Sequence, residues 1–337
     1  MERRNFNYLM AFGAVSMMSC VGSKSSKMMS PSKDIFPNKL FSGARIGLIA
    51  PASASSEEKI QKAIENIESW DLTVVEGKYL RSKNGFLAAT DEQRLEDFHA
   101  MFADPSIDAI WCVRGGYGTN RLLERLDYNL VKNNPKILLG YSDITALLNA
   151  IYHRTGLITY HGPVASSEMT DYARREIENI LFSTSKTAEI YSFNHPMDNV
   201  QSYSVIQAGK AKGRLIGGNL SILSSMCGSG YLPDFADKII FIEDVGERPY
   251  RLDRMLIQLK QASRLREAAA IVFGQFTDCN PPPDSQSVEE VLLDWVKDIP
   301  CPIVSGYSIG HVSNQCVLPV GQMAELDTSR GSITLLG

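Results

Sequence analysis

Long apolar runs are absent from this sequence, and so are long runs of basic residues. Because no apolar stretch reaches the length that crosses a bilayer, a membrane-spanning helix is not expected. The formal net charge is −4 and 21% of the residues are charged, so nucleic acid is not expected as a partner. The 337 residues, 44% of them hydrophobic, instead predict a globular protein with two domains of ordinary size.

Cysteine is also scarce. The six cysteines form no C-x-x-C pair, so neither a zinc site nor another metal site is expected. If Cys20 carries a lipid, an odd number of cysteines remains, which argues against a fully paired disulfide framework. Cys112 lies in an apolar run and is interpreted as a small buried hydrophobic residue.

The common nucleotide- and metal-binding motifs are missing, and we expect no cofactor. There is no P-loop and no H-E-x-x-H, and "RGGYGTNRLL" is not G-x-G-x-x-G because Arg121 stands where the last glycine should be. Gly115 and Gly116 still suit a close approach between backbone and ligand. Arg114 could pair with a carboxylate or could be an ordinary surface arginine.

The N-terminus differs from the rest of the chain. "MERRNFNYLMAFGAVSMMSC" has two arginines, a short apolar run and a small residue before Cys20, which is typical of a lipoprotein signal peptide over residues 1–20. The Ser/Lys-rich residues 21–43 predict a flexible tether. We expect an exported protein that faces the periplasm and touches the membrane only through a lipid on Cys20. A cytoplasmic protein with a disordered extension is the alternative.

Residues 44–171 alternate between strand and helix patterns. Apolar runs such as "ARIGLIAPAS", "DLTVVEG" and "DAIWC" are separated by segments with helical spacing, which predicts an N-terminal doubly wound parallel sheet of the Rossmann or flavodoxin type. Ligands bind such sheets beyond the carboxyl ends of the strands. The glycine turn and Ser142 are both expected at that edge.

The pattern weakens over residues 172–210, where we expect a linker. Residues 211–337 then predict a smaller C-terminal domain of mixed α/β structure. Its strand candidates are "GRLIGG", "KIIFIED", "AAAIVFGQF" and "CPIVS".

Ser142 lies where the buried run Ile137–Gly140 changes to a helical pattern. A nucleophilic serine needs an exposed hydroxyl on a sharp strand-to-helix turn, with backbone N–H groups free to hold an oxyanion. For this stretch taken alone, a helix N-cap at Ser142 or Asp143 is the better explanation. We expect the Asp143 side chain to cap the helix.

A general base and an orienting acid must come from other parts of the chain. His161 and His311 follow strand-like runs and are the candidate bases, whereas the remaining histidines lie in helical or weakly patterned segments. Glu243 and Asp244 end an apolar strand, and Glu247 follows in the turn. A carboxylate at the end of a buried strand needs a partner, but spacing does not say which acid has one.

Taken together, five segments resemble the LD-carboxypeptidase family of serine peptidases, the muramoyltetrapeptide carboxypeptidases. The resemblance covers roughly residues 44–337 and is specific because the segments occur in the family's order. They are "GLIAPAS", "RGGYGTNRLL", "GYSDITALL", "GRLIGGNLSIL" with "IIFIEDVGERPYRLDRMLIQL", and "GYSIGHVSNQCVLPVG".

The resemblance implies roles for individual residues. Ser142 would be the nucleophile, Glu243 the acid and His311 the base, with the active site in the interdomain cleft. The oxyanion hole would use the backbone of Asp143 and the turn near Gly115–Gly116.

The resemblance also implies a reaction. The amide between the L-centre of a diamino acid and the terminal D-alanine of a peptidoglycan tetrapeptide would be hydrolysed through an acyl-enzyme. The resemblance further implies a homodimer. As a separate hypothesis, we expect Arg114 or Arg214 to bind the free carboxylate of the substrate.

Two alternatives stay open. One is an amidase resembling the microcin C immunity proteins, which share the triad but cleave a peptidyl-nucleotide. The other is a non-catalytic, periplasmic-type binding lipoprotein, which would also have two α/β domains and an anchor.

Overall fold

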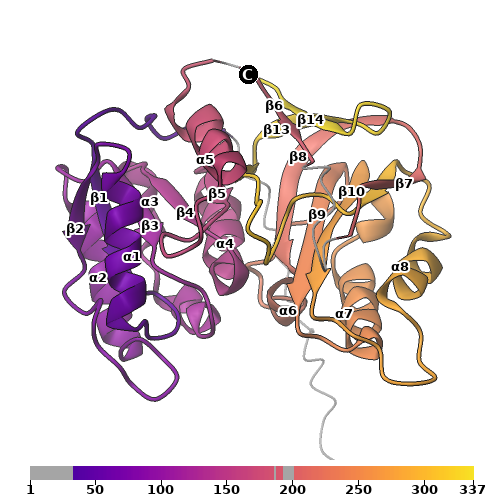
Figure 1. Cartoon of the computed structure of the whole chain (residues 1–337), viewed down its shortest axis with the longest axis horizontal. Coiled ribbons are helices and arrows are strands. Elements are labelled where there is room, and N and C mark those ends of the chain that lie inside the picture. The colour runs from indigo at the N-terminus through magenta and orange to yellow at the C-terminus, as the bar shows by residue number, and fades with distance from the viewer. Residues whose placement is uncertain (1–32, 186, 193–200) are drawn as a thin grey trace, which may run out of the picture.

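The structure is a computed structural model that describes residues 33–185, 187–192 and 201–337. The predicted signal peptide, Cys20 and part of the predicted tether lie outside these residues. Two α/β domains lie side by side, each built on its own sheet (Figure 1). In the described ranges, no helix combines the length and the apolar character that crossing a membrane requires.

The first domain has a six-stranded sheet in the order β12-β5-β4-β3-β1-β2. Its five parallel strands are β1 (Arg45–Ile49), β2 (Thr73–Glu76), β3 (Ala109–Cys112), β4 (Ile137–Gly140) and β5 (Thr159–His161). This confirms the predicted doubly wound parallel sheet. The edge strand β12 (Leu318–Val320) runs antiparallel to β5 and comes from the C-terminal part of the chain.

Helices cover this sheet where the sequence has apolar residues at helical spacing. They are α1 (Glu57–Glu68), α2 (Asp91–Ala103), α3 (Tyr128–Asn133) and α4 (Thr145–Thr155), with 3-10 turns η1 (Thr119–Arg125) and η2 (Ser142–Ile144). A capping box fixes the start of α2, because the Thr90 side chain accepts from the Gln93 N–H and the Gln93 side chain accepts from the Thr90 N–H. Phe98 and Phe102 of α2 are then fully buried.

The second domain has an eight-stranded mixed sheet in the order β6-β14-β13-β8-β9-β10-β11-β7. Its central strands β8 (Lys210–Asn219), β9 (Lys238–Val245), β10 (Ala270–Thr277) and β11 (Ile303–Ser305) are parallel. Antiparallel β13 (Met323–Asp327) and β14 (Ser332–Leu335) extend it. The helices are α6 (Leu220–Ser225), α7 (Pro249–Ala262) and α8 (Val288–Val296).

The expected linker over residues 172–210 contains regular structure in the described part of the chain. Helix α5 (Asp171–Ile177) continues into a π-helical turn η3 (Glu178–Phe182). Strands β6 (Ala188–Tyr191) and β7 (Ser204–Gln207) form opposite edges of the second sheet. Each edge strand has only four residues and is largely exposed, so neither carries the apolar alternation that marks a strand in sequence.

Close backbone contacts join the two domains. A Cβ added to Gly218 of β8 would lie 2.4 Å from the hydroxyl of Thr145 on α4, so only glycine fits there. The Asn219 N–H donates to the same hydroxyl at 3.0 Å, and the Asn149 amide donates to the Gly217 carbonyl at 2.9 Å. Because these contacts are buried, the position of β8 relative to α4 is fixed.

Candidate active site

Ser142 occupies a strained turn at the carboxyl end of β4. Its φ is +62°, a left-handed conformation that is uncommon for a residue with a side chain. Tyr141 is the N-cap of η2, and no side chain caps that turn. The Ser142 hydroxyl does not serve as a helix cap, because it lies 3.1 Å from His311 Nε2 instead.

The Asp143 side chain does not cap its own helix, which corrects our expectation. Its buried carboxylate accepts from the Thr119 N–H at 2.9 Å and so caps η1, the turn that follows the glycine segment. Burial raises the pKa of Asp143, and the hydrogen bonds from Thr119 and Gly118 oppose that shift. Asp143 therefore ties the serine turn to the glycine turn.

Three polar side chains form one hydrogen-bonded chain across the two domains. His311 Nε2 lies 3.1 Å from Ser142 Oγ, and His311 Nδ1 lies 2.9 Å from Glu243 Oε2. Ser142 comes from the first domain, whereas Glu243 lies near the carboxyl end of β9 and His311 follows β11 in the second. The Glu243 side chain is fully buried, and the His311 side chain is 21% exposed. This geometry can move a proton from a serine hydroxyl to an imidazole that a carboxylate orients.

Glu243 favours the protonated form of His311. Burial lowers the pKa of His311, but the hydrogen bond and the negative charge of Glu243, with a smaller effect from Asp244, outweigh burial and raise it. An imidazolium at this position is therefore stabilised by the carboxylate behind it. That is the charge state that forms when His311 accepts a proton.

The other two candidate acids have different partners. Asp244 accepts from the Asn219 amide at 2.9 Å and from the Ser221 hydroxyl at 2.7 Å. Burial and the charge of Glu243 raise the pKa of Asp244 to about 6. Glu247 forms an ion pair with Arg251 at 2.7 Å.

The glycine turn lies against Ser142. A Cβ added to Gly115 would lie 2.8 Å from Ser142 Cβ and 3.2 Å from the Asp143 nitrogen, so a side chain there would fill the space around the hydroxyl. Gly116, which we expected beside the oxyanion, is exposed and has Ser53 rather than Ser142 as its nearest neighbour. Arg114, beside Gly115, donates to the carbonyls of Gly115 and Ala54.

Arg214 is not brought to this site, although we expected it as one of two carboxylate-binding candidates. It lies on β8 opposite Lys238, five residues before Asn219, which pairs with Glu243. At about 3.3 Å per residue, it is roughly 17 Å along the strand from the catalytic end. Asp34 and the Gly321 carbonyl accept its hydrogen bonds there.

A pocket of about 220 Å³ lies beside His311 and is lined by both domains. The first domain contributes Tyr141, Pro163, Ser167 and Glu168, and the second contributes residues 311–313 and Gln315. The Tyr141 ring lies 4.9 Å from the His311 ring. The aromatic position before Ser142 was the only signal in the sequence that could have indicated Tyr141.

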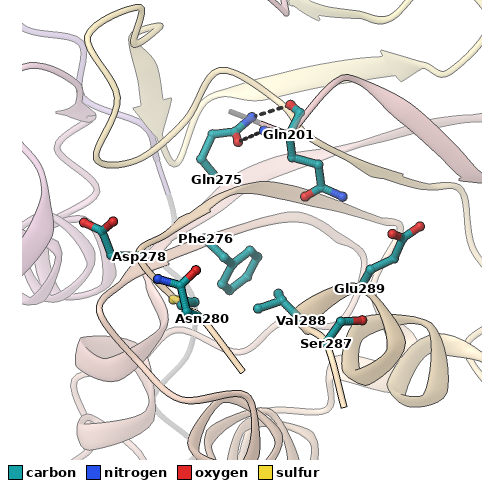
Figure 2. Close-up of a pocket in the computed structure, with 9 residues that line it drawn as sticks. Gln201, Gln275, Phe276, Asp278, Asn280, Ser287, Val288 and Glu289 are labelled. Atoms are coloured by element: carbon teal, nitrogen blue, oxygen red, sulfur yellow. Dashed lines mark hydrogen bonds between the residues drawn. The ribbon is translucent and has the colours of Figure 1, made fainter. Parts of the chain in front are cut away.

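A second pocket, of about 440 Å³, lies near the carboxyl end of β10 and contains none of the three triad residues. Figure 2 shows Gln275 beside it, with its amide paired to the backbone of Gln201 at 2.8 and 2.9 Å. Over residues 33–185, 187–192 and 201–337, this pocket included, no cluster of three or more His, Cys, Asp or Glu side chains could hold a metal ion.

Known proteins match both domains. Residues 46–162 match the LD-carboxypeptidase N-terminal domain, and residues 212–326 match the LD-carboxypeptidase C-terminal domain. The chain is 38% identical over 295 residues to the "Probable murein peptide carboxypeptidase" of Bacillus subtilis, which covers 87% of this chain and 92% of that protein. It is 36% identical to the "Murein tetrapeptide carboxypeptidase" of Pseudomonas aeruginosa, with coverages of 85% and 94%.

Solved structures agree with this match. An MccF-like protein from Bacillus anthracis superposes with a TM-score of 0.80 at 30% identity, covering 90% of this chain and 99% of that one. The muramoyltetrapeptide carboxypeptidase from Oxalobacter formigenes superposes with a TM-score of 0.75 at 28% identity, covering 87% and 98%.

Proposed function

Because the chain belongs to the LD-carboxypeptidase family and is a peptidase, we propose that it removes the terminal D-alanine from murein tetrapeptides by Ser-His-Glu acyl-enzyme chemistry. The observation that carries this proposal is the continuous hydrogen-bonded chain from Glu243 through His311 to Ser142. The names of the Bacillus and Pseudomonas relatives support the choice of substrate.

Acylation begins when His311 Nε2 takes the proton of the Ser142 hydroxyl. The oxygen attacks the carbonyl carbon of the terminal amide, and the carbonyl oxygen becomes an oxyanion. We assign the stabilisation of that oxyanion to the Asp143 N–H and to the backbone of the glycine turn, because a Cβ built on Gly115 would lie 3.1 Å from Ser142 Oγ and 3.2 Å from the Asp143 nitrogen. Glu243 stabilises the imidazolium that His311 becomes.

Release of D-alanine completes the first half of the reaction. His311 gives its proton to the leaving nitrogen, the carbon–nitrogen bond breaks, and an ester to Ser142 remains. Water then attacks the ester with His311 as base, and Ser142 regains its proton when the shortened peptide leaves.

A direct assay tests the proposal. The purified protein is incubated with the tetrapeptide, and free D-alanine is measured beside the Ser142→Ala variant. We expect release by the wild type alone. Equal release by both proteins would rule out the serine mechanism, and release by neither would rule out the substrate.

A second candidate substrate follows from the likeness to MccF. The MccF self-immunity protein of Escherichia coli is 28% identical over 337 residues, and one solved MccF structure holds glutamyl sulfamoyl guanosine. The same assay with an aminoacyl sulfamoyl nucleoside distinguishes the two substrates. Faster turnover of that compound than of the tetrapeptide would favour an immunity-type amidase.

We also propose export through the N-terminal segment, with a lipid on Cys20. Metabolic labelling with a fatty-acid probe tests this, with Cys20→Ser as the control. Labelling that persists in the variant would contradict it.

A further inference from the structure

A carboxylate oxygen of Glu243 and the nearby ring of His161 have no hydrogen-bond partner in the part of the chain that the structure describes. Glu243 Oε2 is paired with His311, but Oε1 of the same fully buried carboxylate is unpaired. His161 is fully buried too, and both of its ring nitrogens are unpaired. Buried polar atoms in native proteins almost always have a partner, because leaving one unpaired costs its full desolvation.

His161 lies on the same side of the structure as the triad. It ends β5 and pairs with Gly140 of β4, two residues before Ser142. Its ring centroid lies 5.2 Å from that of Phe241, which precedes Glu243 by two residues on β9 and so shares its face of the sheet. Its ring also lies 6.1 Å from that of Tyr141.

Burial favours the neutral form of the His161 ring. Burial lowers the pKa of His161 to about 4; the charge of Glu243 opposes this shift, and His311 adds to it. A neutral imidazole has one N–H donor and one acceptor nitrogen, whereas an ionised carboxylate oxygen only accepts. The unpaired donor of His161 and the unpaired Oε1 of Glu243 are therefore complementary.

We propose that His161 is a positioning residue whose ring turns to donate its N–H to Glu243 Oε1, a bond that would satisfy both groups and that the structure leaves unformed. The carboxylate is then held at both oxygens, with Oε1 bound to the first domain and Oε2 bound to His311. This holds the acid in the orientation that His311 needs, and it makes that orientation depend on the docking of the two domains. The inference rests on the proposed function, in which Glu243 is the orienting acid.

Three substitutions test the hydrogen bond. His161→Phe keeps a ring of similar size but removes the donor, whereas His161→Asn and His161→Gln keep an N–H near the positions of Nδ1 and Nε2. We expect His161→Phe to lower kcat by about 10- to 100-fold, the size of one lost hydrogen bond to a charged group, with KM little changed. One of the amide variants should recover most of this loss. Wild-type kcat in His161→Phe, or no recovery in either amide variant, would overturn the proposal.

A double-mutant cycle separates positioning from general stability. If His161 acts through Glu243, His161→Phe should change the residual rate of Glu243→Ala by no more than about twofold. An equal loss in both backgrounds would mean that His161 only supports packing, and the inference would be wrong.

A fluorophosphonate probe that reacts with the activated serine makes this test independent of the identity of the substrate. Absence of D-alanine release by the wild type would refute the proposed function. The labelling rate of Ser142 in the same variants would still decide whether His161 acts through Glu243.

Discussion

The two domains contribute to the candidate site in different ways. In the first domain, the position of Ser142 is set locally, by a left-handed residue at a strand end and by Asp143, which holds the neighbouring turn. In the second domain, Glu243 and His311 lie on separate segments and meet the serine only across the boundary. The first domain alone therefore positions the nucleophile, whereas activation of the nucleophile requires both domains.

The segment that carries His311 is attached to both domains. Before it, the Ile309 carbonyl accepts from the Gln275 N–H at 2.9 Å, within the second domain. After it, β12 joins the edge of the first sheet beside β5. Because the segment is tied to both domains, His311 is held at the boundary from both sides.

The largest effects should come from removing the atoms that react. Ser142→Ala and His311→Ala should each lower kcat by about 10⁴-fold or more, and the double variant should be no worse than either, since the residues act as a unit. Steady-state kinetics on the tetrapeptide measures this. Multiplicative losses would show that the two side chains act independently.

Glu243→Gln should lower kcat by about 10²- to 10⁴-fold. The substitution changes only a residue of the second domain and leaves the serine turn of the first domain intact. His311 must be neutral to accept the serine proton, and Glu243 raises its pKa, so the acidic limb of kcat/KM should lie above pH 6.5 in the wild type. In the variant burial still lowers the pKa of His311, so the limb should move to lower pH. An unmoved limb would show that Glu243 does not control His311.

The same shift predicts a stability difference with a definite sign. The folded-state pKa of His311 is raised, so its contribution to the free energy of unfolding is fully present below pH 6.5 and is lost as pH rises through the raised value. The stability gap between wild type and Glu243→Gln should thus be larger at pH 5.5 than at pH 8.5. Denaturant unfolding at both pH values measures it.

Gly218→Ala should disturb the docking of the domains without touching a reacting atom. The added methyl group would lie 2.4 Å from the Thr145 hydroxyl, and we expect a loss of roughly 1–3 kcal/mol in stability together with a lower kcat. Gly228→Ala is the matched control, because Gly228 also has positive φ but no atom within 4 Å of the added Cβ. Thr145→Ala in the Gly218→Ala background should recover part of the loss. Equal effects of the two glycine variants would attribute the loss to backbone strain alone.

The sequence could predict the sheet of the first domain because its buried strands and amphipathic helices alternate. The order of the motifs also indicated Ser142, Glu243 and His311 as candidate catalytic residues, although 169 residues separate the serine from the histidine. The partner of Asp143 could not be predicted, since a carboxylate beside a turn can cap its own helix or a neighbouring one. The crossing of β12 to the first sheet was equally hidden, because three residues carry no periodicity.

The smallest effects concern the two arginines that the sequence offered as carboxylate-binding candidates. Arg114 lies beside the glycine turn, so Arg114→Met should raise KM for the tetrapeptide by about tenfold if it binds the terminal carboxylate. Arg214 lies in the middle of β8, five residues before Asn219, where it pairs with Asp34. Arg214→Met should therefore leave KM unchanged and lower stability by about 1 kcal/mol.

Amidation of the peptide's C-terminus provides the decisive control for this pair. An amidated peptide should bind equally weakly to the wild type and to Arg114→Met, because the group that Arg114 contacts is no longer charged. A KM difference that persists with the amide would mean that Arg114 acts through the glycine turn, whose Gly115 carbonyl it contacts. A raised KM in Arg214→Met would instead show that the middle of β8 is coupled to the active site through the domain interface.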